Sequence, residues 1–127
     1  MVRSIYSANA AQHQNPVPNA AVHRGVLVTS AILGKESGAD EYAGTVDRQI
    51  ELAFDGLIAV LEAADASPQD VVKLDLFFAD KSDRPKANVH WLRLWPDEHR
   101  RPARQAHVAK LPNRCLFQIV AMAVVGG

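Results

Sequence analysis

The residue with the clearest chemical potential in this sequence is Arg104, which follows the segment Pro102-Ala103. The proline fixes the direction of the chain just before a predicted strand, so the guanidinium can be held rigidly. A fixed guanidinium offers two parallel N–H donors that match a carboxylate. Arg104 is therefore a candidate carboxylate anchor, and a structural salt bridge is the alternative that the residues leave open. The nearby Arg100 and Arg101 are more typical of a solvated loop.

Metal and nucleotide chemistry have little support in the sequence. None of the five histidines forms an i, i+4 helical pair or a short H-x-H spacing, so we expect no metal site. Glycine-rich phosphate-binding motifs are also absent, so nucleotide-dependent chemistry is not predicted. The histidines are His13, His23, His90, His99 and His107.

Two possible nucleophiles have simpler explanations. Ser30 lacks a G-x-S-x-G motif, and a serine at the end of a strand is more often a turn former. Cys115 lies in an apolar context, which favours a small core residue over a reactive thiolate. As the single cysteine, it cannot form an internal disulfide, and this is consistent with a reducing, cytoplasmic location.

Hydrophobic periodicity predicts the elements that position these residues. Apolar residues at helical spacing predict a helix from Val46 to about Ala64, and Asp83 is expected to cap a second helix that ends before Pro96. Ser67 to Asp70 has the chemistry of a capped turn. Alternating or β-branched segments predict strands at 26–30, 71–78, 104–109 and 116–125. A short strand at 21–22 precedes the first of these.

Length and composition limit the class of protein. The 127 residues are expected to form one domain, in which residues 1–15 are a flexible or edge-strand N-terminus. The 14 basic and 14 acidic residues give a net charge of zero, which argues against a nucleic-acid partner. No apolar run is long enough to span a bilayer, and no secretory signal is evident, so we expect no membrane partner.

The element order favours an α+β fold with both helices on one face of a mixed sheet. Such a sheet has a second face that needs cover, and oligomerisation would supply it. The last predicted strand, 116–125, is apolar on both faces, which agrees with a buried interface.

Short segments from about residue 16 to residue 125 follow a particular order. They include Leu61-Glu62-Ala63-Ala64, Asn88-x-x-Trp91, Trp95-Pro96, Pro102-Ala103-Arg104, Leu111-Pro112 and Ala121-Met122-Ala123-Val124. This series resembles the Rid family, also called YjgF/YER057c/UK114. The resemblance implies a chorismate-mutase-like α+β fold with a mixed six-stranded sheet and two helices on one face. It also implies a homotrimer with clefts between subunits.

The resemblance further implies cofactor-independent hydrolysis of reactive enamines and imines to a keto product and ammonia. Arg104 matches the arginine that clamps the substrate carboxylate, Ser30 the serine at the end of a strand, and Asn88 the asparagine of the second helix. Gln118 falls where the family has a glutamate that positions the hydrolytic water. Unlike a glutamate, Gln118 can orient water but cannot exchange a proton near pH 7.

Other departures from the family pattern affect the expected pocket. Ala31 replaces the glycine after the serine, and Val17 or Pro18 stands where the deaminases have a tyrosine. The segment between Arg104 and Leu111 is one residue shorter than in the best-known members, which leaves the strand register open. His107, like His23 or His99, is a candidate proton carrier, but strand alternation points it away from Arg104 unless a bulge intervenes.

Three functions remain under consideration. The first is a Rid-type deaminase for small carboxylate-bearing enamines or imines, with a pathway-specific deaminase of the amino-muconate type as a variant. The second is a non-catalytic trimer that binds a carboxylate metabolite, which the change from glutamate to Gln118 motivates. A ribonuclease activity, attached to some family members, is disfavoured by the neutral charge.

Overall fold

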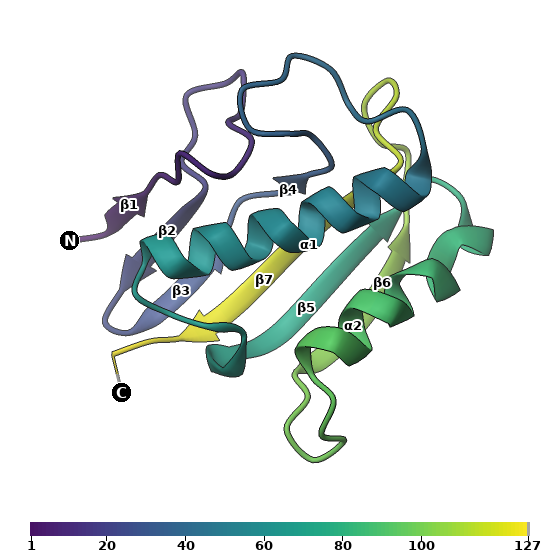
Figure 1. Cartoon of the computed structure of the whole chain (residues 1–127). Coiled ribbons are helices and arrows are strands. Elements are labelled where there is room, and N and C mark those ends of the chain that lie inside the picture. The colour runs from purple at the N-terminus through teal and green to yellow at the C-terminus, as the bar shows by residue number, and fades with distance from the viewer. Residues whose placement is uncertain (127) are drawn as a thin grey trace.

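A computed structural model describes residues 1–126 and contains a seven-stranded mixed sheet (Figure 1). The hydrogen-bonded order is β1-β2-β3-β7-β5-β6, and β4 also pairs with β7. All pairs are antiparallel except β5 with β6. The strands are β1 Arg3–Ile5, β2 Ala20–His23, β3 Val26–Thr29, β4 Ile32–Leu33, β5 Val71–Phe78, β6 Ala103–Val108 and β7 Phe117–Val124.

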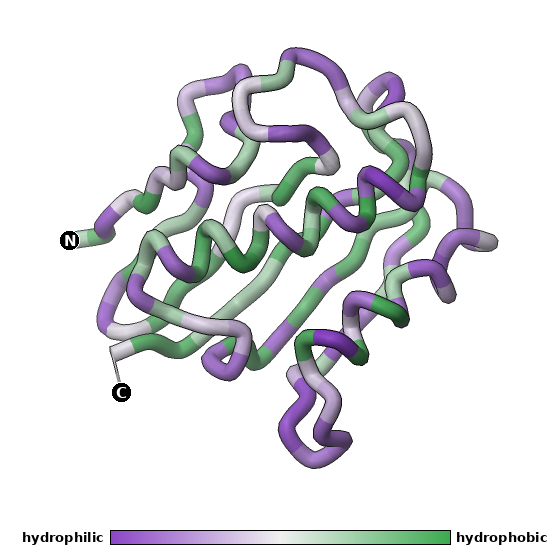
Figure 2. Tube along the Cα trace, viewed as in Figure 1, coloured by the Kyte–Doolittle hydropathy of each residue, from purple (hydrophilic) through white to green (hydrophobic). Residues whose placement is uncertain are grey.

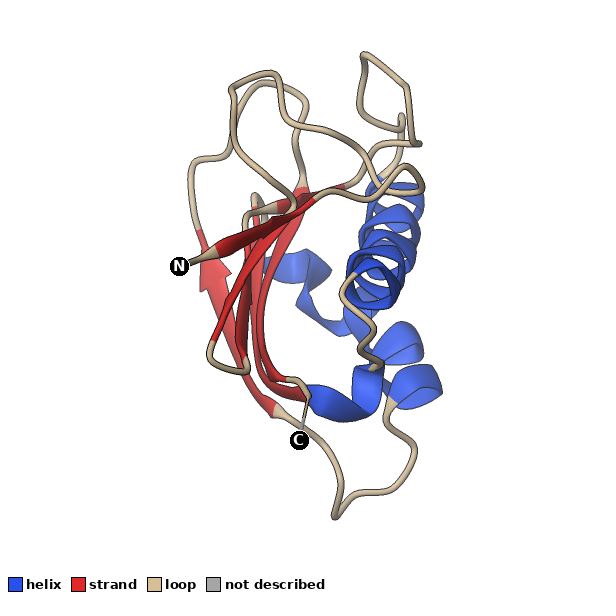
Figure 3. Ribbon diagram, turned by 90° about the vertical axis from the view of Figure 1, so that its left-hand side faces the viewer, coloured by secondary structure: helices blue, strands red, loops and turns tan. Residues whose placement is uncertain are grey.

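Two α-helices cover one face of this sheet and leave the other uncovered, as Figure 3 shows. They are α1, Val46–Ala63, and α2, Asn88–Leu94. This arrangement confirms the expected α+β fold class. The strand count is seven rather than six, because the two-residue strand β4 adds to the sheet beside β7.

The core lies between α1 and the central strands. Phe54, Leu57 and Leu61 on α1 are fully buried, and so are Leu74 and Ile119 on the facing strands. Figure 2 shows apolar and polar residues alternating along α1, as expected of a helix with one buried face. The Thr45 hydroxyl accepts a hydrogen bond from the Arg48 N–H at 3.2 Å and caps the helix. The predicted start at Val46 is therefore confirmed.

The segment before α2 differs from the prediction. Asp80, not Asp83, is the capping residue, and its carboxylate accepts from the Ser82 N–H at 2.9 Å. The chain then forms a 3₁₀ segment, η2 (Lys81–Ala87), before α2 begins. Pro85 lies inside this segment and has no N–H to donate to an α-helical ladder. Asp83 instead pairs with Lys86 at 3.0 Å.

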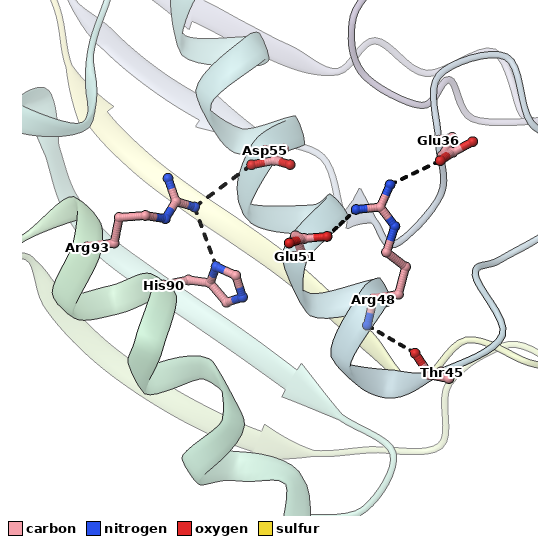
Figure 4. A network of polar contacts seen from close by, with 7 residues as sticks. All are labelled: Glu36, Thr45, Arg48, Glu51, Asp55, His90 and Arg93. Carbon is pink, nitrogen blue, oxygen red and sulfur yellow. Dashed lines mark hydrogen bonds and ion pairs between the residues drawn. The ribbon is translucent and has the colours of Figure 1, made fainter.

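A polar network fixes the surface of α1 (Figure 4). Arg48 pairs with Glu51 on the helix and reaches Glu36 in the preceding loop at 3.0 Å. On the other side, Arg93 of α2 lies 3.8 Å from Asp55 of α1. The network therefore ties both the 34–44 loop and α2 to α1, and these two segments contribute residues to the clefts described below.

The uncovered face of the sheet carries exposed apolar side chains. Val26 pairs with Val124 and Val28 with Met122, so these four side chains share one face. They are 44%, 52%, 41% and 41% exposed, respectively. No helix among residues 1–126 is both long and apolar enough to cross a membrane.

Candidate active site

Arg104 lies near the start of β6, the strand at one edge of the sheet. It is in register with Leu74 of β5, which is fully buried beneath the helices, so Arg104 points to the helix-covered side. Its Nη1 donates to Asn88 Oδ1 at 2.9 Å. Its guanidinium carbon lies 5.1 Å from the centre of the Trp91 ring. Two residues of α2 therefore fix the orientation of the guanidinium, one by a hydrogen bond and one by a cation–π contact.

The charge of Arg104 is not neutralised by an ion pair with any described residue. Among residues 1–126, no carboxylate lies within salt-bridge distance of it. Partial burial lowers the pKa of Arg104, but a guanidinium remains charged at neutral pH. Arg104 and Asn88 line a cleft of about 570 Å³, which we call the arginine cleft; its other lining residues are Lys81, Ser82, Arg84, Pro85 and Ala106. The cleft therefore presents an oriented cation to solvent.

Gln118 and Ala31 line a second cleft, of about 580 Å³, which we call the glutamine cleft. Gln118 lies on β7, between Leu33 of β4 and Phe77 of β5. The remaining lining residues come mainly from three loops; they are His13, Gln14, Asn15, Leu33, Lys35, Asp40, Glu41, Tyr42, Pro112, Asn113 and Arg114.

Gln49 joins two of the loops that line the glutamine cleft. Its Nε2 donates to the carbonyl oxygens of Ala43 at 2.8 Å and Arg114 at 2.9 Å. Its Oε1 accepts from the Leu116 N–H at 2.8 Å. Gly34 allows this arrangement, because a Cβ there would lie 2.6 Å from the Gln49 Cβ. Loop 34–44 and loop 112–116 are thus joined through one side chain that is 1% exposed.

The two clefts are separate within one chain. Gln118 is in register with Phe77, three residues along β5 from Leu74, the register partner of Arg104. Residues three apart on a strand point to opposite faces, so Gln118 and Arg104 lie on opposite sides of the sheet. One chain therefore brings Arg104 together with Asn88, and Gln118 together with Ala31, but not the two pairs with each other.

His107 belongs to neither cleft. It is in register with Phe77, and the two rings stack with their centres 4.5 Å apart. Its Nε2 lies 2.9 Å from Asp75 Oδ1. Strands β5 and β6 pair without interruption from Lys73–Ala103 to Phe78–Val108, so the shorter segment before Leu111 causes no bulge in this strand pair. The predicted orientation of His107, away from Arg104, is confirmed.

Ser30 and Cys115 contribute less directly. The Ser30 N–H donates to the Asn19 carbonyl at 3.0 Å, and the side chain lines neither cleft, although its neighbour Ala31 does. Cys115 is 2% exposed, as expected of a small core residue. Among the described residues, no group of three His, Cys, Asp or Glu side chains is placed to hold a metal ion.

Comparison with known proteins identifies the family. The sequence profile of the family described as Endoribonuclease L-PSP matches residues 7–125. The RutC family protein UK114 of Drosophila melanogaster is 33% identical over 129 residues, which cover 99% of this chain and 92% of that protein. The chain belongs to the Rid (YjgF/UK114) family.

Solved structures of Rid proteins have the same fold. RidA from the Antarctic bacterium Psychrobacter sp. has a TM-score of 0.88 at 26% identity and covers 97% of this chain and 99% of its own. The YjgF gene product of E. coli has a TM-score of 0.84 at 26% identity and covers 96% and 98%, respectively. The resemblance to the Rid family seen in the sequence is therefore confirmed.

Some residues of the two clefts are not evident from the sequence. Trp91 appears in the sequence only as part of the segment Asn88-x-x-Trp91, and the structure shows that its ring supports Arg104. The sequence signal for this role is that Asn88 and Trp91 are three residues apart, because residues at this spacing lie on the same face of a helix. Lys35, Tyr42 and Arg114 lie in loops without periodicity, so no sequence pattern brings them to Gln118.

Proposed function

We propose that this Rid protein hydrolyses enamines or imines that carry a carboxylate, in a site formed where two copies of the chain meet. The observation that carries the proposal is Arg104, a guanidinium fixed by Asn88 and Trp91 and left without a carboxylate partner among residues 1–126. A cation held in this way is suited to bind the carboxylate of a small substrate through paired N–H donors.

The reaction needs a held substrate and a water molecule placed to attack it. An imine R₂C=NH reacts with one water to give R₂C=O and NH₃, through addition of oxygen to the carbon and loss of the amine. Arg104 would fix the carboxylate, which places the C=N carbon. The Gln118 amide would orient the water through hydrogen bonds. Because Gln118 exchanges no proton, we expect modest rates compared with a site that has a carboxylate there.

A second copy of the chain would bring the two clefts together. Arg104 lies on β6, whose outer edge has no strand partner within the described chain. The uncovered face of the sheet also presents the exposed apolar side chains of Val26, Val28, Met122 and Val124. Burial of such a face is a strong drive for association. Membership of the Rid family favours a homotrimer as the assembly.

The test is a semicarbazone assay in which an amino-acid oxidase generates 2-iminobutyrate in the presence of the protein. We expect the wild type to accelerate loss of the imine. Arg104→Ala should lower kcat/KM by about 10- to 100-fold, the equivalent of one charge-assisted hydrogen-bond pair. Arg100→Ala is the matched control, since Arg100 is exposed and pairs only with Asp97. No acceleration by the wild type with any small imine would refute the proposal.

Gln118 supports a second candidate, a trimer that binds a carboxylate metabolite without turnover. Isothermal titration with 2-oxobutyrate distinguishes the two functions. Binding that depends on Arg104, with no release of ammonia from imines, favours the binding protein. The variant Gln118→Glu then becomes informative, because a carboxylate at this position should raise the hydrolysis rate by about 100-fold in the deaminase.

A further inference from the structure

Lys35 is a largely buried lysine with no carboxylate partner among the described residues. The side chain is 9% exposed, and its Nζ lies 4.6 Å from the centre of the Tyr42 ring. Among residues 1–126, no carboxylate lies within salt-bridge distance of it. A buried charge is costly unless something pairs with it. Among residues 1–126 the Lys35 ammonium therefore has only the face of the Tyr42 ring beside it, and an external anion could pair with it.

Lys35 is one of the residues that line the glutamine cleft, together with Gln118. No side-chain nitrogen or oxygen of the described residues is both shut off from solvent and without a hydrogen-bond partner. Since Nζ has no such partner among the described residues, it reaches solvent, and Tyr42, whose ring lies beside it, lines the same cleft. The stem of the side chain is thus largely buried while its charged end stays accessible.

Tyr42 does not neutralise this charge. Burial, with a further contribution from the Cys115 thiol, raises the pKa of Tyr42 to about 12. The phenol therefore stays neutral at physiological pH and offers Lys35 only the face of its ring.

The other charged groups of the cleft are more exposed. Asp40 and Glu41 carry two negative charges, and Arg114 adds a positive charge to that of Lys35. The side chains of Asp40, Glu41 and Arg114 are exposed, so solvent screens them more than the ammonium of Lys35. Arg114 has a left-handed backbone, with φ of 66°, and Gln49 holds its carbonyl. Lys35 is thus the least exposed of these four charged residues, and solvent screens the other three more strongly.

We propose that Lys35 forms a subsite for a second anionic group, so that the preferred substrate is an imine or enamine with a carboxylate at each end. This inference rests on the proposed function, in which Arg104 of one copy binds the first carboxylate and the glutamine cleft of another copy receives the rest of the substrate. The second carboxylate would pair with the Lys35 ammonium in the glutamine cleft.

The test compares imines of equal chain length that differ in one carboxylate. The oxidase reaction on glutamate gives 2-iminoglutarate, and on norvaline it gives 2-iminopentanoate; 2-iminoadipate extends the series by one carbon. We expect the wild type to prefer a dicarboxylate by at least about 10-fold in kcat/KM, the usual effect of one added ionic contact. The KM for the dicarboxylate should also rise more steeply with salt.

Variants of Lys35 show whether this residue causes the preference. Lys35→Met should reduce the ratio of the two kcat/KM values to about 1, because kcat/KM for 2-iminoglutarate should fall far more than kcat/KM for 2-iminopentanoate. Lys35→Arg should keep much of the preference. Lys110→Met is the control for loss of an exposed lysine outside both clefts. Circular dichroism and the oligomer size of each variant report whether it is folded.

The outcomes separate this inference from the proposed function. Equal kcat/KM for mono- and dicarboxylates in the wild type overturns the Lys35 subsite while leaving the deaminase intact. If the wild type hydrolyses no imine, the proposed function fails, and isothermal titration with succinate, glutarate and adipate decides the subsite. Binding of one of these dicarboxylates that is at least about 10-fold weaker in Lys35→Met supports the subsite. Equal binding by the two proteins overturns it.

Discussion

Replacement of Gln49 by leucine should lower the free energy of unfolding by more than the loss of a single hydrogen bond would. The side chain is 1% exposed and makes hydrogen bonds of 2.8, 2.9 and 2.8 Å to three backbone groups. Leucine has a similar volume but leaves two carbonyl oxygens and one N–H without their partner. A lost hydrogen bond costs about 1 kcal/mol, and an unsatisfied buried group about 1–3 kcal/mol. Because these partners are only partly buried, we expect a total of about 3 kcal/mol.

Urea unfolding at a fixed protein concentration measures this loss, since association also contributes to the stability of an oligomer. The midpoint should fall while the m-value stays near that of the wild type. Gln69→Leu is the matched control: Gln69 is exposed in the 3₁₀ turn η1, Pro68–Asp70, and its change should stay within about 0.5 kcal/mol.

The same variant should affect the function of the glutamine cleft. Without Gln49, loops 34–44 and 112–116 lose their common anchor, and the KM for substrate should rise. A loss of stability below about 1 kcal/mol would refute the reasoning, because the three hydrogen bonds would then contribute nothing beyond the packing of an apolar side chain. Gln49→Glu tests the donor role of the Gln49 Nε2 group separately, because a carboxylate oxygen cannot donate to the carbonyl oxygens of Ala43 and Arg114.

Further predictions concern packing, a tryptophan hydrogen bond and pH. Gly34→Ala should destabilise the protein by about 1–3 kcal/mol in thermal unfolding, because the new Cβ would lie 2.6 Å from the Gln49 Cβ. Gly44→Ala is the control and should be near neutral, because nothing lies within 4 Å of a Cβ there. Trp95→Phe should cost about 1–3 kcal/mol in urea unfolding, since it removes a 2.9 Å bond to the Pro68 carbonyl and leaves a gap. Burial, with a neighbouring arginine, lowers the pKa of His90 below its usual 6.5. The unfolded chain therefore takes up the proton first, so the contribution of neutral His90 is complete above pH 6.5 and declines as pH falls. His90→Gln should show a smaller loss of stability on acidification to pH 5 than the wild type, and an equal loss would contradict the assignment.

Periodic segments were the part of the fold that the sequence predicted best. The long amphipathic helix and the alternating strand at 71–78 were predicted within one or two residues, because each pattern repeats over many positions. The prediction that Asp83 caps the second helix was wrong, because Asp80 is the capping residue. The sequence offers two aspartates before Pro85, and capping preference alone does not choose between them. The two-residue strand β4 is too short to leave any period.

The site was predictable only in part, for a geometric reason. Arg104 and Asn88 meet because helix α2 packs beside strand β6 on the same face of the sheet. The alternation of side chains along the strand was enough to predict that His107 faces away from Arg104. Lys35 and Tyr42 meet Gln118 through loops whose paths depend on Gln49 and on Gly34. Such paths are set by tertiary hydrogen bonds, which no local pattern in the sequence encodes.

The position of Arg104 on an edge strand suits the proposed site between two copies of the chain. An arginine near the middle of the sheet would be surrounded by its own core and would need an internal counter-ion. At the edge, α2 can hold the guanidinium from one side through Asn88 and Trp91 while the other side stays open. The glutamine cleft has the matching property, a buried stem and an open charge at Lys35. In the proposed assembly, each half would be held by contacts within its own chain before the copies meet, so formation of the site would need little reorganisation of either half.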